Sequence, residues 1–237
     1  MLVIVDYRIS YEIESNLKAL GFIVVKTVEA PFLDEPVNGH PDMVLLPITK
    51  SKVIINPQIY SQMAPKLVKE GVQLITGRTV LEATYPLNIA YNALKIEDYL
   101  LHKIDHTDPV IVQYLSHSDQ SLVNVKQGYT KCASTKIDEH AIITADDGIY
   151  QTVKKLGFEA LLIRPGYIDL LGYPYGFIGG ASGFCDNKVF FTGHLNKHPD
   201  KAFIYDFIKS LGYQIVLLSD KPAYDYGTLI FLEGEER

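Results

Sequence analysis

Short apolar runs alternate with longer amphipathic segments along the whole chain. Five runs of four residues predict buried strands, beginning at Val3, Val53, Tyr99, Ala141 and Val189 ("VIVD", "VIIN", "YLLH", "AIIT" and "VFFT"). Each is followed by a segment of helical length and then by a second apolar run ("FIVVKT", "VQLIT", "SLVNV", "FEALLI" and "YQIVLL"). A variable loop and a third strand follow. The pattern predicts a cycle of strand, helix, strand, loop and strand.

Polar and glycine residues mark the ends of the predicted helices. Helix starts are expected at Asn56-Pro57, Asp108-Pro109, Asp147-Gly148 and His198-Pro199-Asp200, because a capping side chain accepts from the first turn and proline suits that turn. Four helices are expected to stop at Gly21, Gly71, Gly157 and Gly212, where glycine adopts a left-handed conformation without strain. The third segment has no such glycine.

The five cycles divide the chain into similar units, approximately 1–52, 53–98, 99–140, 141–188 and 189–237. Units of this length must bury their apolar faces against their neighbours. The first strand of the chain is positioned to complete the last unit. We therefore predict a single α/β domain of five units closed into a ring. An open doubly wound sheet is the alternative for alternating strands and helices.

A polar or glycine-rich loop precedes the third strand of each unit. The loops are "NGHPDM" (38–43), "YPLNIAYN" (85–92), "QGYTKCAS" (127–134), "YGFIGGASG" (175–183) and "PAYDYGT" (222–228). A ring brings all five together. In the fourth loop, no helix follows the glycines as a phosphate-binding loop requires. Gly179 and Gly180 are instead expected to allow close backbone approach, with Asp186-Asn187 as a hairpin turn.

Composition narrows the classes of partner. The net charge is −6 and the basic residues are scattered, which argues against nucleic acid. No signal peptide is recognised, and no window approaches the ~20 apolar residues of a membrane span. With 2 cysteines in 237 residues, we expect free thiols and a cytoplasmic protein. The oligomeric state is left open, and no cofactor motif is recognised.

These units resemble the pentein fold, the five-bladed α/β propeller of guanidino-group-modifying enzymes. The stretches "GHPDM" (39–43), "GYTKCAS" (128–134) and "GFIGGASG" (176–183) are most similar to a bacterial family of that fold without assigned function. The superfamily includes deiminases, dimethylarginine hydrolases, amidinotransferases and a non-catalytic ribosome anti-association factor. The resemblance implies a central cavity lined by the five loops and occupied by a small-molecule ligand.

Guanidine chemistry needs carboxylates to hold the planar cation, a thiolate to attack its carbon and a histidine to move protons. Asp42 and Asp225 supply carboxylates. His40 lies two residues from Asp42, so on a strand both would face one side, with His40 as base. The alternative is a loop in which Asp42 caps a turn and His40 is solvated.

The hydrolytic members of this superfamily carry the attacking cysteine just before the final strand and a histidine in the third unit. Here those places read Asp225 to Thr228 and Tyr129 to Cys132, so neither residue is present. Cys132 is the remaining candidate nucleophile, with Lys131 lowering its pKa; the alternative is a buried small hydrophobic residue. Further candidate binding residues on the loops are Asn88, Asn92, Tyr129, Lys131, Gly179 and Gly180.

The two cysteines occupy different positions within their units, counted from the strand that follows each of them. Cys132 and Gly180 occupy equivalent places in successive units, so we expect both to border the central cavity. Cys185, nearer the hairpin turn, is expected outside it and without a disulfide to Cys132. His194 and His198 lack a third ligand at useful spacing, so no metal site is predicted.

Two functions from different classes fit these observations. The first is an amidinohydrolase- or amidinotransferase-like enzyme acting on a guanidino or amidine-type molecule. The second is a non-catalytic protein that binds a metabolite or a protein partner.

Overall fold

The computed structural model describes residues 1–234 and contains five sheets of three strands. The sheets are β15 (Ile230–Leu232), β1 (Leu2–Val5) and β2 (Ile23–Lys26); β3 (Leu45–Pro47), β4 (Lys52–Ile55) and β5 (Gln73–Thr76); β6 (Leu94–Ile96), β7 (Tyr99–His102) and β8 (Ser121–Asn124); β9 (Ser134–Lys136), β10 (Ala141–Thr144) and β11 (Glu159–Leu162); and β12 (Ser182–Cys185), β13 (Lys188–Phe191) and β14 (Gln214–Leu217). The helices are α1 (Tyr11–Ala19), α2 (Pro41–Val44), α3 (Tyr60–Val68), α4 (Pro109–Ser116), α5 (Asp147–Lys155) and α6 (Lys201–Ser210).

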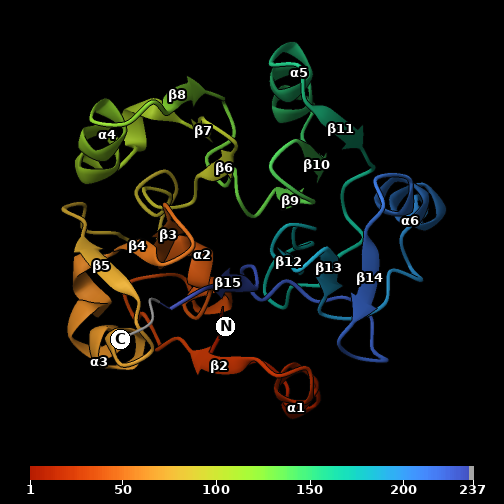
Figure 1. Ribbon diagram of the computed structural model, residues 1–237, viewed down its shortest axis with the longest axis horizontal. Coiled ribbons are helices and arrows are strands. Elements are labelled where there is room, and N and C mark those ends of the chain that lie inside the picture. The colour runs from red at the N-terminus through yellow and green to blue at the C-terminus, as the bar shows by residue number, and fades with distance from the viewer. Residues whose placement is uncertain (235–237) are drawn as a thin grey trace.

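Every sheet has the same topology. Its middle strand pairs in parallel with the strand that follows it and antiparallel with the inner strand. Figure 1 shows the sheets following one another in chain order, with β3, β6, β9, β12 and β15 towards the centre. The pairing of β15 with β1 joins the two ends of the chain in one sheet. Each other sheet combines the last strand of one expected unit with two strands of the next.

Both sets of predicted strands are present, and most helix ends follow the predicted signals. Gly21, Gly71, Gly157 and Gly212 have φ values of 90°, 79°, 91° and 86°, which confirms them as left-handed helix stops. The start of α5 differs by one residue, because it is Asp146 whose side chain accepts from the Ile149 amide.

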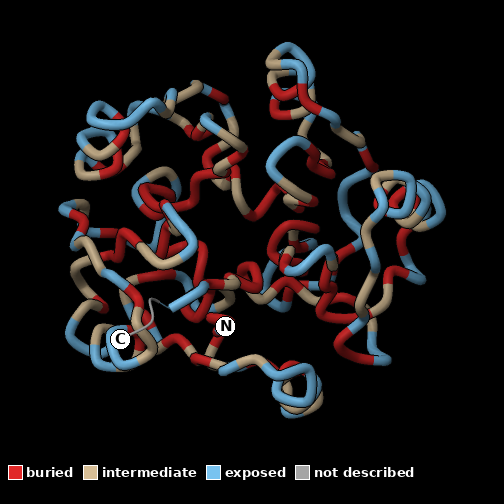
Figure 2. The backbone as a smooth tube through the Cα atoms, viewed as in Figure 1, coloured by how far each residue is buried: buried red, intermediate tan, exposed pale blue. Residues whose placement is uncertain are grey.

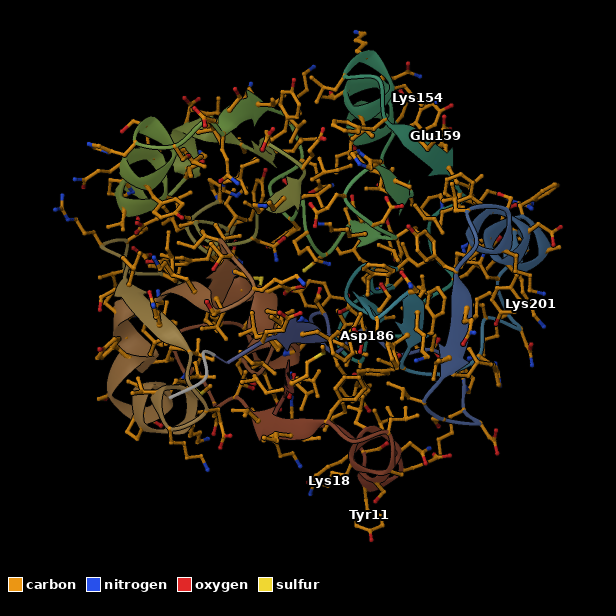
Figure 3. All side chains as sticks on the ribbon, viewed as in Figure 1. Tyr11, Lys18, Lys154, Glu159, Asp186 and Lys201 are labelled. Carbon is orange, nitrogen blue, oxygen red and sulfur yellow. The ribbon has the colours of Figure 1, made fainter. Side chains whose placement is uncertain are left out.

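Burial follows the amphipathic pattern. The middle strands are buried, whereas α1 buries only Ile13 and Leu17. Figure 2 shows the exposed residues on the outer sides of the helices, and in Figure 3 Tyr11 and Lys18 of α1 point away from the molecule. Each fully buried aliphatic side chain stabilises the fold by about 1.5–3 kcal/mol. No helix within residues 1–234 is long and apolar enough to cross a bilayer.

A buried polar side chain stands at the end of each middle strand: Asp6, Asn56, His102, Thr144 and Thr192. Several of them fix the loop before the inner strand. The Thr144 hydroxyl donates to the Ala133 carbonyl at 2.9 Å. The Thr192 hydroxyl donates to the Tyr224 carbonyl at 2.7 Å. These bonds anchor the third and fifth loops to the sheets and so position the site.

The buried His102 makes stability depend on pH. Its Nε2 lies 3.0 Å from the Ile89 carbonyl of the second loop, and burial lowers its pKa from 6.5 to about 4. Below pH 6.5 the unfolded chain therefore binds a proton that the folded chain excludes. We expect this group to remove about 2 kcal/mol from the free energy of unfolding between pH 7 and pH 5.

Urea unfolding at pH 7 and pH 5 measures this loss. The His102→Gln variant should show a pH dependence smaller by about 2 kcal/mol, whereas His117→Gln, which changes an exposed histidine, should behave as the wild type. An unchanged pH dependence in His102→Gln would contradict the assignment.

Candidate functional site

The five predicted loops meet at one group of hydrogen-bonded side chains. Asn92 of the second loop donates through Nδ2 to the Asp42 carbonyl at 3.2 Å and to Cys132 Sγ at 2.9 Å. Thr228 of the fifth loop contacts the Gly179 carbonyl of the fourth loop at 3.0 Å. We call Asp42, Asn92, Lys131, Cys132 and Thr228 the central cluster. The convergence predicted for the loops is confirmed.

Asp42 is held by a short helix. His40 caps α2, which begins at Pro41, so the expectation of a strand at this place is wrong, because proline fixes the first helical turn. His40 and Asp42 are both 1% exposed, so the alternative of a solvated histidine is also wrong. Asp42 Oδ2 accepts from Thr228 Oγ1 at 2.6 Å and from Cys132 Sγ at 3.2 Å. Its buried Oδ1 has no hydrogen-bond partner within residues 1–234.

Asn92 links the second and third loops. Its Oδ1 accepts from the backbone amides of Lys131 at 3.0 Å and Cys132 at 3.1 Å. With its Nδ2 bonds to Asp42 and Cys132, both ends of the buried amide are used. A buried amide satisfied in this way fixes the position of both loops.

The environment of Cys132 favours the protonated thiol. Burial raises its pKa well above the usual value, and the carboxylates of Asp42 and Asp225 raise it further. The expectation that Lys131 lowers the Cys132 pKa is wrong, because desolvation and the two carboxylates outweigh any effect of the lysine. The thiol donates its hydrogen to Asp42 and accepts one from Asn92.

Lys131 and Thr228 complete the central cluster. Lys131 Nζ donates to Thr228 Oγ1 at 3.2 Å and to the Ser134 carbonyl at 3.4 Å, and burial lowers its pKa. Thr228 has a φ of 72°, which costs a β-branched residue about 1–3 kcal/mol. Its backbone amide donates to the Gly180 carbonyl at 2.9 Å. Thr228 was not among the candidate residues predicted from the sequence, where only its place in the fifth loop indicates that it lies near the site.

A pocket of about 330 Å³ reaches the central cluster. Asp42, Lys131 and Thr228 line it, together with residues of the inner strands and hairpin turns: Lys50, Lys95, Lys136, Glu139, Cys185 and Asp186 among them. In Figure 3, Asp186 lies near the centre of the view, whereas Lys154 and Lys201 lie at the periphery. Lys50, Lys95 and Lys136 were also missed, because they lie on inner strands or a hairpin turn outside the five loops.

The structure corrects the placement of the cysteines. Cys185 lines the pocket, whereas Cys132, Gly179 and Gly180 are not among its lining residues. The physical reason is that the pocket runs along the inner strands to their hairpin ends, and Cys185 is the last residue of β12. Both thiols are free, so the absence of a disulfide was predicted correctly.

The close backbone approach predicted at the glycines of the fourth loop is confirmed, and the neighbouring backbone is that of the third loop. The Gly180 amide donates to the Cys132 carbonyl at 3.1 Å, and a Cβ on Gly179 would lie 2.5 Å from the same oxygen. Asp186 and Asn187 have φ values of 48° and 59°, which confirms the hairpin turn.

His40 and Asp225 belong to a second buried group. His40 Nε2 lies 4.0 Å from Asp6 Oδ2, and its Nδ1 lies 3.8 Å from Asp225 Oδ1. Burial raises the pKa of Asp225, which accepts from the amides of Phe177 and Gly227 at 2.8 and 2.9 Å. Neither His40 nor Asp225 is among the pocket residues. The sequence grouped them with Asp42, and it gave no signal for Asp6 as their neighbour.

Asn88 and Tyr129 form a third group. The Tyr129 hydroxyl donates to Asn88 Oδ1 at 3.1 Å, and burial raises the Tyr129 pKa. Its ring lies 5.6 Å from that of Tyr85 and 6.3 Å from that of Phe177. Neither Asn88 nor Tyr129 lines the pocket. Within residues 1–234, no set of three or more His, Cys, Asp or Glu side chains is arranged to hold a metal ion.

The chain has five small sheets, and each sheet contains one parallel pair of strands, one antiparallel pair and an associated helix. This is the fold of the penteins. An amidinotransferase of the saxitoxin biosynthetic pathway from Microseira wollei is similar, with a TM-score of 0.58 and 10% identity over 95% of this chain and 79% of that one. Inosamine-phosphate amidinotransferase from Streptomyces griseus has a TM-score of 0.55 and 9% identity over 97% of this chain and 82% of that one. DDAH from Pseudomonas aeruginosa, a cysteine-to-serine mutant complexed with citrulline, has a TM-score of 0.55 and 11% identity over 95% and 92%.

The particular family is shown by the sequence. The chain belongs to the family of unknown function DUF6873, which it matches over residues 4–230. A comparison with curated protein sequences gave no significant match. At identities of 9–11%, the structural likeness establishes the fold.

Proposed function

We propose that this protein is a five-bladed α/β propeller of five repeated units that binds a small guanidino or amidine-type cation in its central pocket. The observation that carries this proposal is Asp42 Oδ1, a buried carboxylate oxygen without a hydrogen-bond partner within residues 1–234, on a residue that lines the pocket. A planar cation with paired N–H groups supplies the missing donor. The pairing of β15 with β1 supports the closed arrangement.

The energetics of Asp42 favour a cationic ligand. An unsatisfied buried acceptor costs about 1–3 kcal/mol, and more when it is charged. Thr228 and Cys132 satisfy only Oδ2. A volume of about 330 Å³ suits a metabolite-sized molecule. The fold shared with amidinotransferases is in keeping with a guanidino-type ligand, and the two free thiols are in keeping with a cytoplasmic location.

The Asp42→Asn variant tests the proposal. It should bind guanidinoacetate about tenfold or more weakly, because the charge-assisted hydrogen bonds are lost. The melting temperature without ligand should change little, since the asparagine oxygen still accepts from Thr228 and Cys132. Isothermal titration of wild type and variant measures the difference.

Two controls sharpen this test. Ureidoacetate, which carries an uncharged ureido group in place of the guanidinium and keeps the carboxylate, should bind wild type no better than it binds Asp42→Asn. Asp225→Asn changes a buried carboxylate outside the pocket and should retain wild-type affinity. Equal affinity of wild type and Asp42→Asn for guanidinoacetate would refute the proposal.

A second candidate function is catalysis, and the 3.2 Å contact between Cys132 Sγ and Asp42 Oδ2 favours it. In this scheme Asp42 takes the thiol proton and sulfur adds to the guanidinium carbon. The carbon–nitrogen bond then breaks, and the amine leaves with a proton. Water attacks the resulting carbon and releases the thiol. His40, the expected base, would need to act from the second buried group.

Release of ammonia or amine separates catalysis from binding. If the protein is an enzyme, it should turn over guanidino compounds, and this turnover should disappear in Cys132→Ser. The same compounds should also slow alkylation of the Cys132 thiol. The raised pKa of Cys132 instead favours the binding function, for which we expect no turnover and slow alkylation at pH 7.

A further inference from the structure

Four lysines line the pocket, and their surroundings differ. Lys50 pairs with Glu233 at 2.8 Å, and Lys136 pairs with Glu139 at 2.6 Å. Lys131 makes no ion pair with a carboxylate within residues 1–234; its Nζ donates to the Thr228 hydroxyl and the Ser134 carbonyl. Lys95 also lines the pocket, but no hydroxyl or carboxylate contact of its ammonium group is seen in the same range.

The environment of Lys131 favours the free amine. Burial penalises its ammonium form and lowers its pKa, and the carboxylates of Asp42 and Asp225 oppose this shift without reversing it. An amine that is desolvated and held without a carboxylate partner is the form in which lysine acts as a nucleophile. Lys136 also has a pKa lowered by burial, yet Glu139 holds it as an ion pair.

A hydrogen-bonded chain connects this amine to a carboxylate. Lys131 Nζ lies 3.2 Å from Thr228 Oγ1, and Thr228 Oγ1 lies 2.6 Å from Asp42 Oδ2. The hydroxyl accepts from nitrogen and donates to the carboxylate, so it can relay a proton between them. The strained φ of 72° at Thr228 is the backbone conformation in which its hydroxyl makes both contacts.

We propose that the pocket accepts a small aldehyde or ketone and that Lys131 forms an imine with its carbonyl carbon. The lone pair of Nζ forms the carbon–nitrogen bond as the carbonyl π bond breaks. A proton passes from nitrogen through Thr228 to Asp42 and is returned to the former carbonyl oxygen. A second proton from nitrogen follows the same path, water leaves, and the carbon–nitrogen double bond forms.

The walls of the pocket suit this product. Leu45, Ala93, Leu229 and Ile230 are among the apolar side chains that line it. An apolar wall limits the access of water, which slows hydrolysis of the imine. This inference rests on Lys131, Thr228 and Asp42; it shares Asp42 with the guanidino ligand proposed above but does not require that ligand.

Reductive trapping tests the inference. The protein is incubated at pH 7 with propanal and sodium cyanoborohydride, and the modified lysines are identified by peptide mass spectrometry. Lys131 should be modified at least ~10-fold faster than Lys95 and Lys136, because only Lys131 has the hydrogen-bonded relay through Thr228 to Asp42. In Lys131→Arg this adduct should vanish, whereas Lys136→Arg should retain it.

A second comparison tests the relay. Thr228→Val should slow trapping at Lys131 by about 100-fold, the lower end of the contribution of general acid–base assistance, whereas Thr228→Ser should keep most of the rate. Circular dichroism shows whether each variant is folded. Modification of Lys131 at the same rate as Lys95, or equal rates for Thr228→Val and Thr228→Ser, would overturn the proposal. If the wild-type protein binds no guanidinoacetate but is still trapped at Lys131, only the proposed function is overturned.

Discussion

Replacing Gly179 by alanine will destabilise the protein by on the order of 4 kcal/mol, a large effect for a single methyl group. The added Cβ would lie within 2.5 Å of the carbonyl oxygens of Lys131, Cys132 and Ser134. All three atoms belong to the backbone of the third loop, so no side-chain rotation relieves the clash. The melting temperature should fall by about 8–16 °C.

Gly148→Ala is the matched control. The nearest atom to its Cβ is Asp146 Oδ1 at 3.1 Å, and the residue lies within α5. We expect a change within about 1 kcal/mol, because alanine is the better helix former. Thermal and urea unfolding of both variants measure the contrast. Equal stabilities would mean that the fourth loop does not pack on the third as described.

Replacing Asn92 by alanine should cost about 3 kcal/mol, because the buried Cys132 amide and Asp42 carbonyl would lose their partners. The Asn92 side chain accepts from Cys132 N at 3.1 Å and donates to Asp42 O at 3.2 Å. The loss should also loosen the central cluster. Cys132 should therefore be alkylated faster in the variant than in the wild type.

Asn88→Ala provides the comparison on the same loop. Its side chain contacts the Ala83 carbonyl and the Tyr129 hydroxyl at 3.1 Å each, away from the pocket. We expect a loss of about 1 kcal/mol and unchanged alkylation of Cys132. If Asn88→Ala exposed Cys132 as much as Asn92→Ala, the central cluster would not depend on Asn92.

The sequence by itself determined the elements and the loops that meet at the site. Strands such as Val53–Ile55 are specified by apolar runs, and the helix stops by glycines such as Gly157, whose φ is 91°. These signals act between residues that are neighbours in the chain, so they can be recognised without tertiary contacts. The five loops followed from their common place before the inner strands.

Only the tertiary structure decided which loop side chains share a site. Thr228 and Asp42 are separated by 186 positions in the sequence, yet their side chains lie 2.6 Å apart. No periodic pattern fixes the direction of a side chain in an irregular loop, so His40 could not be separated from Asp42. Cys185 ends strand β12, and its place in the pocket depends on how the inner strands assemble. The raised pKa of Cys132 and the lowered pKa of Lys131 arise from burial, which depends on groups from several sheets. Long-range packing therefore determined the chemistry of the site, whereas local pattern determined the frame that carries it.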